Sequence, residues 1–349
     1  MKIDTYKMFT NCIPVKGNRR SIICDLQRGT FHLIPNILYE ILVENTILSV
    51  EVLVKKYGIK YAVTIKEYLD FLIGNEYIFE CLREEVSFFP NLNLDWQHFA
   101  QITNSIIELD SISPVEFKKI ISELEELGCK NIEIRFFALS QKKILDYFEV
   151  FDDSIVSNVT LVVKYHKKLC SKKEIIAIMN STFGRLKTVI HHSNYINSNS
   201  IVNNTRYYRT KEKIESSDFC GVINWKFFSL NIPTFTESQK HNTCLNRKIS
   251  IDVNGEIKNC PSMTKSYGNI RDTTLKEAIE KPGFKDMWFI HKDQIDVCKD
   301  CEFRHICTDC RAYIQDPNNI YSKPAKCSYD PYTATWGEEN PTNNPLYGK

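Results

Sequence analysis

The residues of this sequence that are best suited to chemistry are cysteines gathered toward its C-terminal end. Of the chain's 13 cysteines, seven lie between residues 244 and 327, with the spacing C-x10-G-x4-C, then C-x2-C-x5-C-x2-C, then one more after sixteen residues. Two thiolates separated by two residues can reach one metal centre from a tight turn, so such pairs are typical metal ligands. The candidate ligands are Cys244, Cys260, Cys298, Cys301, Cys307, Cys310 and Cys327.

Seven thiols are compatible with more than one metal. The N-terminus does not read as a signal peptide, so we expect a reducing cytoplasm, where disulfides are rare. Zinc would leave thiols over, or would need a dinuclear site with His291 or His305 as the eighth ligand. Two four-iron clusters, one of them with an incomplete set of thiolates, fit the count equally well.

The cysteine spacing resembles that of the SPASM domain, the auxiliary-cluster module at the C-terminus of radical SAM peptide-modifying enzymes. That family usually has three residues between the last two cysteines of the central run, and this chain has two. The resemblance implies two [4Fe-4S] clusters, one held by Cys298, Cys301, Cys307 and Cys327, the other by Cys244, Cys260 and Cys310. Related enzymes often take the missing fourth ligand from a cysteine just before the motif, where this chain reads FTESQKHNT; Cys220 is a more distant alternative.

Composition and length narrow the class of protein. A chain of 349 residues is long enough for two or three domains. A hydrophobic content of 43% and a charged content of 25% are typical of a soluble globular protein. A net charge of +2 gives no reason to expect nucleic-acid binding, and no apolar run is long enough to predict a membrane span.

Residues 1–88 predict a small α+β domain. A strand within Tyr6–Val15 precedes a hairpin of Ser21–Leu26 and Thr30–Ile34, and helices follow at Pro35–Val43, after Ser49, and at Val63–Ile73. This order resembles the PqqD-like, winged-helix-type domain that recognises precursor peptides, in which a leader peptide adds as a strand to the hairpin edge. The resemblance implies peptide binding by Thr30, Phe31, His32, Leu33 and Ile34.

Residues 92–235 predict a partial α/β barrel. Strands at Ile102–Leu109 and Ile132–Leu139 flank a helix that begins with a capping box at Ser113, which is a parallel crossover unit. We expect further strands at Val159–Tyr165, Leu186–His191 and Val222–Leu230, and helical segments at Lys142–Phe151 and Lys172–Met179. His191-His192 opens an Asn/Ser-rich stretch that we expect to be a solvated loop.

This crossover unit resembles the start of a radical SAM barrel, with one sharp departure. The family places C-x3-C-x2-C after its first strand, where three thiolates hold a four-iron cluster that binds S-adenosylmethionine. The corresponding loop here, Asp110–Ser113, contains no cysteine, and Arg135–Ala138 stands where the family has a glycine-rich stretch. The resemblance therefore implies a degenerate barrel without radical chemistry, and S-adenosylmethionine binding is not expected.

Residues 240–330 form the SPASM-like part, with a helix near Thr274–Glu280, and 331–349 predict an extended or disordered tail. The order of parts resembles the SPASM-domain peptide maturase of grasp-with-spasm systems. It implies maturation of a ribosomally synthesised peptide beside an ATP-grasp ligase that forms ester or amide crosslinks. In this hypothesis the chain binds the precursor's leader and carries the clusters. A catalytic iron–sulfur peptide-modifying enzyme and a zinc-stabilised scaffold remain the alternatives.

Overall fold

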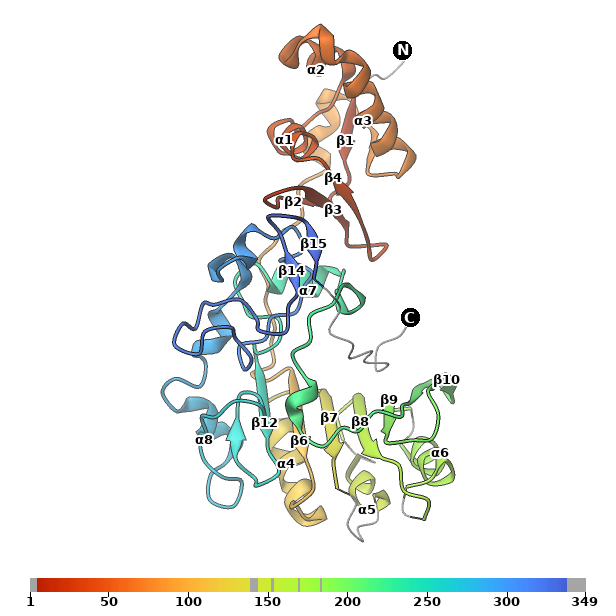
Figure 1. Cartoon of the computed structure of the whole chain (residues 1–349), viewed down its shortest axis with the longest axis vertical. Coiled ribbons are helices and arrows are strands. Elements are labelled where there is room, and N and C mark those ends of the chain that lie inside the picture. Colours follow the sequence, from red (N-terminus) through yellow and green to blue (C-terminus); the bar gives the residue numbers. More distant parts are fainter. Residues whose placement is uncertain (1–4, 139–143, 152–153, 169, 183, 338–349) are drawn as a thin grey trace.

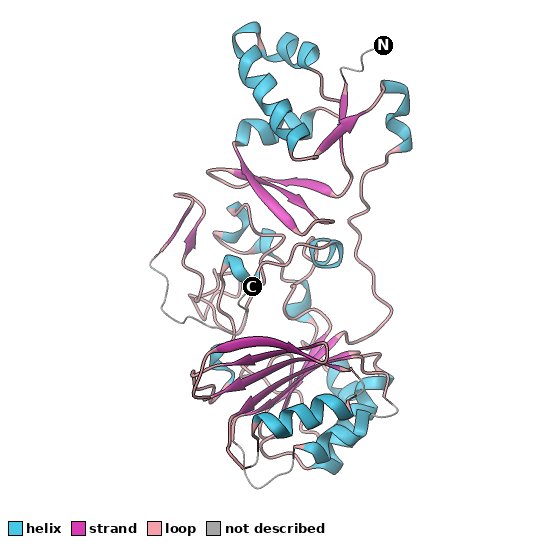
Figure 2. Ribbon diagram, turned by 90° about the vertical axis from the view of Figure 1, so that its right-hand side faces the viewer, coloured by secondary structure: helices cyan, strands magenta, loops and turns pink. Residues whose placement is uncertain are grey.

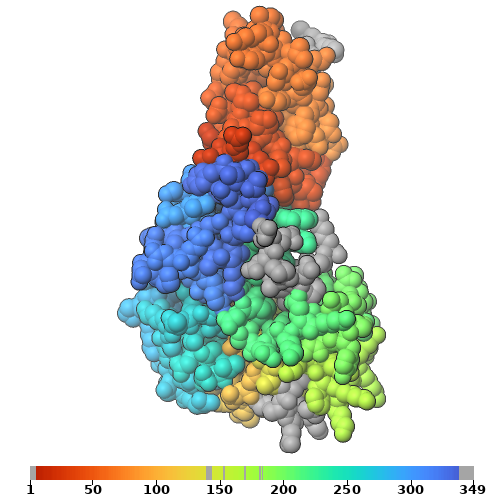
Figure 3. All heavy atoms as spheres, viewed as in Figure 1, coloured from red at the N-terminus to blue at the C-terminus, as the bar shows by residue number. Residues whose placement is uncertain are grey.

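The computed structural model describes residues 5–138, 144–151, 154–168, 170–182 and 184–337. Three parts follow one another along its longest axis (Figures 1 and 3). The N-terminal domain lies at one end, the cysteine-rich region lies in the middle, and an α/β domain lies at the other end. Among the described residues, no helix is both long and apolar enough to cross a membrane.

The N-terminal domain contains the predicted hairpin and three helices. An antiparallel sheet has the order β2-β3-β4, and β1 pairs separately with β5, a strand that was not predicted. The side chains of α1, α2 and α3 that lie at helical spacing fill one core with the strands. The elements are β1 (Tyr6–Met8), β2 (Cys12–Val15), β3 (Ser21–Asp25), β4 (Thr30–Ile34), α1 (Asn36–Glu44), α2 (Val50–Tyr57), α3 (Ala62–Gly74) and β5 (Ile78–Glu80).

The α/β domain is built on one open sheet of eight strands, ordered β10-β11-β9-β8-β7-β6-β12-β13. All pairs from β11 to β12 are parallel, and an antiparallel pair closes each side. The strands are β6 (Asn104–Glu108), β7 (Asn131–Phe136), β8 (Asn158–Lys164), β9 (Leu186–His192), β10 (Ser198–Val202), β11 (Thr205–Arg209), β12 (Lys248–Ile251) and β13 (Ile257–Lys258).

Helices cover one face of this sheet (Figure 2). Alternation along the strands sends Ile107, Ile134 and Leu161 into the core beneath α4 (Pro114–Glu126) and α6 (Lys172–Ser181). Both helices start at a serine that forms a capping box, as predicted for α4. Between them in sequence, the predicted 142–151 helix is a short α-helix, α5 (Leu145–Phe148), followed by a 3-10 turn at Glu149–Phe151; residues 139–143 lie outside the description.

The opposite face of the sheet points toward the cysteine-rich region (Figure 2). It carries charged side chains, including the buried Glu108 and Arg135. Glu108, Arg135 and Lys248 belong to the alternate positions of β6, β7 and β12. Since β12 follows Cys244 in sequence and pairs in parallel with β6, the SPASM-like part supplies a strand to this sheet. The two parts therefore share a structural element.

Two predictions for the α/β domain are wrong. The expected strand Val222–Leu230 is instead a single bridge between Ile223 and Cys327, followed by a 3-10 turn. The expected solvated loop at His191-His192 is the buried end of β9. The reason is that the Asn/Ser-rich stretch after it folds into the hairpin of β10 and β11, and β11 pairs in parallel with β9.

The buried His191 has partners for both ring nitrogens. Nε2 lies 3.0 Å from the carbonyl oxygen of Cys170, which can only accept, so Nε2 carries the hydrogen. Nδ1 therefore accepts from the hydroxyl of Tyr207 at 2.8 Å. Burial lowers the pKa of both His191 and His192 to about 4, so the fold holds both rings neutral.

The cysteine-rich region has little regular structure. Its elements are α7 (Ile232–Glu237), α8 (Leu275–Glu280), several 3-10 turns, and a hairpin of β14 (Tyr329–Asp330) and β15 (Thr335–Trp336). The sequence predicted an extended or disordered tail from residue 331, but the hairpin continues to Trp336. The reason is that Tyr329 and Trp336 pack together in a core shared with the N-terminal domain. Residues 338–349 lie outside the description.

The N-terminal domain is held to this region by close polar contacts. The Asn18 amide donates to the Asp300 carbonyl at 2.7 Å, and the Arg20 guanidinium pairs with the buried Glu302 at 2.8 Å. A Cβ added to Gly17 would lie 2.8 Å from the Cβ of Glu302, so only glycine allows this approach. The docked residues lie between two of the candidate ligands, Cys298 and Cys307.

The two buried histidines predict a specific pH dependence of stability. The unfolded chain binds their protons below about pH 6.5, whereas the fold resists protonation down to about 4. Their contribution to the stability of the fold is therefore fully present above pH 6.5 and is lost as the pH falls toward 4. Within that window, each unit by which the pH falls lowers the free energy of unfolding by about 1.4 kcal/mol for each histidine. Urea unfolding across the window should give a shallower pH dependence for His192→Asn than for the wild type; equal slopes would contradict the assignment.

Candidate metal centre

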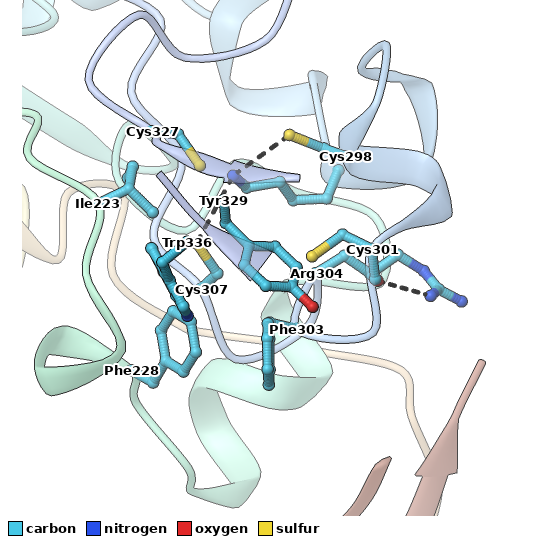
Figure 4. Close-up of a pocket in the computed structure, with 11 residues that line it drawn as sticks. Ile223, Phe228, Cys298, Cys301, Phe303, Arg304, Cys307, Cys327, Tyr329 and Trp336 are labelled. Carbon is cyan, nitrogen blue, oxygen red and sulfur yellow. Dashed lines mark hydrogen bonds between the residues drawn. The ribbon is translucent and has the colours of Figure 1, made fainter. Parts of the chain in front are cut away.

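Four of the candidate ligands line one hollow in the cysteine-rich region. The thiols of Cys298, Cys301, Cys307 and Cys327 line a common hollow that opens to solvent (Figure 4). Aromatic rings supply most of the remaining wall: Phe228, Phe303, Tyr329 and Trp336. Within the described ranges, no three Cys, His, Asp or Glu side chains lie close enough together to hold one ion. In a four-iron cluster, each thiolate binds a different iron, so the thiols stand further apart.

A buried lysine reaches into this hollow. Lys292 Nζ lies 3.8 Å from the sulfur of Cys298, 3.8 Å from that of Cys307, and 3.4 Å from a carboxylate oxygen of Asp309. Burial alone would lower the pKa of Lys292, but the negative charges that Cys307, Cys298 and Asp309 carry when ionised raise it above its usual value. The lysine is therefore a cation that favours thiolates over thiols.

The free thiols themselves are neutral. Burial raises the pKa of Cys307 to about 12 and raises the pKa of Cys298 above its usual value. Because metals bind the thiolate, a metal entering this hollow displaces the thiol protons, and the ammonium of Lys292 then offsets part of the negative charge.

The other three candidate ligands gather at a second place, on the charged face of the sheet. The Lys248 ammonium on β12 lies 3.5 Å from the sulfur of Cys244. Burial, together with the negative charges that Cys244 and Cys260 carry when ionised, raises the pKa of Cys310 to about 12. The strands β12 and β13 bring Cys244 and Cys260 together, and the turn after Cys307 carries Cys310 to them. Cys310 is not among the residues that line the first hollow.

One carboxylate connects the two thiol groups. Asp309 is buried between Cys307 and Cys310 and forms an ion pair with Arg311 at 2.7 Å. It also accepts from the Asn242 side-chain amide at 2.6 Å. The side chain of Asn242 accepts in turn from the backbone amide of Cys244 at 3.0 Å. In the sequence, Asp309 is one of the two residues between Cys307 and Cys310, and no sequence pattern marks it for this role.

The two histidines considered as zinc ligands lie elsewhere. The residues that line the first hollow include neither His291 nor His305. The Nδ1 atom of His305 is 3.2 Å from the Ser238 hydroxyl, and burial lowers the pKa of this ring to about 4. His291 Nδ1 lies 3.5 Å from the carboxylate of Asp293.

The radical SAM resemblance would place a cluster in the loop after β6. In this structure a side chain of that loop, Asp110, binds the backbone that follows β7. The Asp110 carboxylate accepts from the backbone amides of Phe137 at 3.2 Å and Ala138 at 2.9 Å. Beside it, Arg135 forms an ion pair with Glu133 at 2.6 Å. Charged side chains therefore fill the carboxyl ends of β6 and β7.

Comparison with known families identifies the cysteine-rich region. Residues 243–302 match the SPASM iron–sulfur cluster-binding domain. This range includes Cys244, Cys260, Cys298 and Cys301, and the remaining candidate ligands follow it. No protein of curated function matches the chain.

Solved structures of SuiB from Streptococcus suis have a low overall similarity. The form bound to the precursor peptide SuiA gives a TM-score of 0.37 at 10% identity, covering 91% of this chain and 98% of that one. The form bound to S-adenosylmethionine gives 0.34 at 12% identity, covering 88% and 96%. A further SuiB structure gives 0.28 at 12% identity with the same coverage. Scores this low support no conclusion about this chain.

The role of Asp309 predicts a large loss of stability in the Asp309→Ala variant. Removing this carboxylate leaves the charges of Lys292 and Arg311 buried without their partner, which should lower the free energy of unfolding by about 3–5 kcal/mol. Urea unfolding under anaerobic conditions measures the difference. The matched control is Asp95→Ala, which breaks an exposed pair with Lys240 and should cost about 1 kcal/mol or less. Similar losses in both variants would show that Asp309 is not a structural centre.

Proposed function

We propose that this chain is an iron–sulfur component of ribosomal peptide maturation that binds a precursor peptide and acts beside an ATP-grasp ligase. Its N-terminal PqqD-like domain takes the leader, and its SPASM domain holds two four-iron clusters. The proposal is carried mainly by one observation, the contact between the open edge strand β4 and the thiol-lined hollow. The ligase would then act on the core peptide presented beside this contact.

The register of the N-terminal sheet leaves one edge of β4 open. The backbone amide of Leu26 donates to the carbonyl of Asn11, and Pro14, which lies opposite Ile23, has no N–H to donate. Because the direction of the main-chain groups alternates along a strand, the even-numbered residues of β3 form their hydrogen bonds with β2. Ile23 therefore forms its hydrogen bonds with β4. By the same alternation, the N–H and C=O groups of Phe31 and Leu33 on β4 point outward.

That open edge is suited to strand addition. Among the described residues, β4 pairs only with β3, and Thr30, His32 and Leu33 are exposed. An unpaired edge offers main-chain donors and acceptors to an extended peptide. His32 stacks edge-on against Phe71 of α3, with ring centres 5.9 Å apart, so the helix forms one wall beside the edge.

The other face of β4 contacts the wall of the hollow. The rings of Phe31 and Phe303 meet edge to face with centres 5.5 Å apart. Phe303 lies between Cys301 and Cys307 in sequence and lines the hollow together with Tyr329, 5.1 Å away. A peptide on β4 would therefore lie one side chain away from the first thiol group.

A bound cluster would either transfer electrons or stabilise the fold as a structural centre. The chain's own residues would hold it with Cys298, Cys301, Cys307 and Cys327, offset its negative charge with Lys292, and shield it with the surrounding rings. These are the features that a buried anionic centre needs.

Metal content tests the proposal directly. Anaerobically purified protein should contain about eight iron and eight acid-labile sulfide per chain. The Cys327→Ser variant should lose about half of both, because Cys327 serves only one of the two thiol groups. The control is Cys81→Ser, whose thiol lies in the N-terminal domain beside the carbonyl of Leu82 at 3.4 Å. About one or two zinc with no sulfide would contradict the iron–sulfur function and favour a zinc-stabilised scaffold.

Peptide binding is tested at the open edge. A fluorophore-labelled leader segment of a candidate precursor peptide should bind the wild type with a rise in fluorescence anisotropy. Leu33→Pro should weaken binding at least about tenfold, because proline removes an outward donor while the pairing of β3 with β4 remains.

The matched control for that variant is Leu33→Ala, which keeps the backbone donor and shortens an exposed side chain. It should retain most of the affinity. Equal affinities of the leader for wild type and Leu33→Pro would place peptide binding elsewhere.

A further inference from the structure

We propose that Cys220 is the fourth thiolate ligand of the metal site formed by Cys244, Cys260 and Cys310. The inference rests on the metal site of the proposed function and adds to it a ligand that lies outside the cysteine motif. It is drawn from the path of one segment, residues 217–223, which crosses the charged face of the sheet and joins the cysteine-rich region.

The segment passes directly against Cys310. A Cβ added to Gly221 would lie 2.9 Å from the Cys310 sulfur and 2.8 Å from the Tyr313 ring, and Gly221 has a positive φ of 82°. Only glycine permits this approach of backbone to thiol. The neighbour of Cys220 in the chain is thus in van der Waals contact with one of the three ligands.

Residues next to the other candidate ligands hold the same segment. The Ser217 carbonyl accepts from the hydroxyl of Ser262, two residues after Cys260, at 3.4 Å. The Lys326 ammonium donates to the carbonyl of Cys220 at 2.8 Å. Neighbours of both Cys260 and Cys327 therefore hold the backbone around Cys220, although Ser262 and Lys326 are far from Cys220 in sequence.

The thiol of Cys220 also lies beside a buried cation. Its sulfur is 3.2 Å from the guanidinium of Arg135, which is only 2% exposed. Across the site, the Lys248 ammonium lies 3.5 Å from the sulfur of Cys244. A centre held by four thiolates is an anion, and a buried anion is stable only beside positive charge. Arg135 and Lys248 supply that charge here, as Lys292 does in the first hollow.

A fourth thiolate would change what this site can do. Three thiolates leave one iron open to substrate, whereas four close the coordination. The assignment therefore favours a centre that transfers electrons or holds the fold, and it removes the open iron on which a directly catalytic role would depend.

The metal content of four variants provides the first test. Cys220→Ala should lower iron and sulfide as much as Cys244→Ala does, by about half of the wild-type content. Gly221→Ala, which keeps every cysteine but pushes the segment away from Cys310, should give a similar loss. Its matched control is Gly184→Ala, at a similar φ of 75° but with open space around it, which should keep the wild-type content. Unchanged iron and sulfide in Cys220→Ala would overturn the assignment.

The wild type provides a second test that does not depend on the folding of a variant. Iodoacetamide labelling followed by peptide mass spectrometry compares metal-loaded protein with protein stripped by a chelator. Loading should slow the labelling of Cys220 several-fold, together with that of Cys244, Cys260 and Cys310. Equal labelling of Cys220 in both states would overturn the assignment.

The two proposals fail in different ways. If the chain holds zinc and no sulfide, the iron–sulfur function fails, and loss of zinc from Cys220→Ala would still support the ligand. If iron is present and Cys220→Ala retains all of it, the function stands and the ligand is wrong. If the wild type binds no metal, both are wrong.

Discussion

A single buried carboxylate, that of Asp309, determines how the cysteine loops are arranged. It pairs with Arg311, whose guanidinium also donates to the carbonyls of Ile320 and Ser322 at 2.9 and 2.8 Å, on the chain leading to Cys327. Through Asn242 it reaches the turn that carries Cys244, and through Lys292 it reaches the first hollow. Because this region has few helices or strands, the network replaces the backbone hydrogen bonds that position ligands in more regular folds.

The three parts of the molecule are joined at surfaces that also carry the candidate sites. The N-terminal domain docks on the loop between Cys298 and Cys307 through Arg20 and Glu302. The sheet of the α/β domain presents Arg135 to the sulfur of Cys220 and Lys248 to that of Cys244. The open sheet thus has a definite structural role, since its strands support the cysteine-rich region with the face that its helices leave uncovered.

Much of this could be predicted from local sequence. The hairpin of β3 and β4, the capping boxes and the strands β6 to β9 follow from alternation and helical spacing, and the cysteine spacing indicated metal binding. Cys220 could not be assigned in this way, because it lies 24 residues before Cys244 and only tertiary packing brings the two together. The β10–β11 hairpin did leave a signal: Asn203 and Asn204 adopt positive φ values of 47° and 62°, as in the two-residue turn that asparagine favours.

The sharing of β12 between the sheet and the SPASM region has a consequence for how the protein is made. During synthesis, β6 emerges more than a hundred residues before β12, its parallel neighbour. Until β12 arrives, β6 is a hydrophobic border strand with unpaired main-chain groups, the kind of surface that recruits other chains. The nascent α/β domain is thus vulnerable to aggregation until the first stretch of the cysteine motif has left the ribosome. A fragment that ends before residue 244 would keep that exposed border permanently.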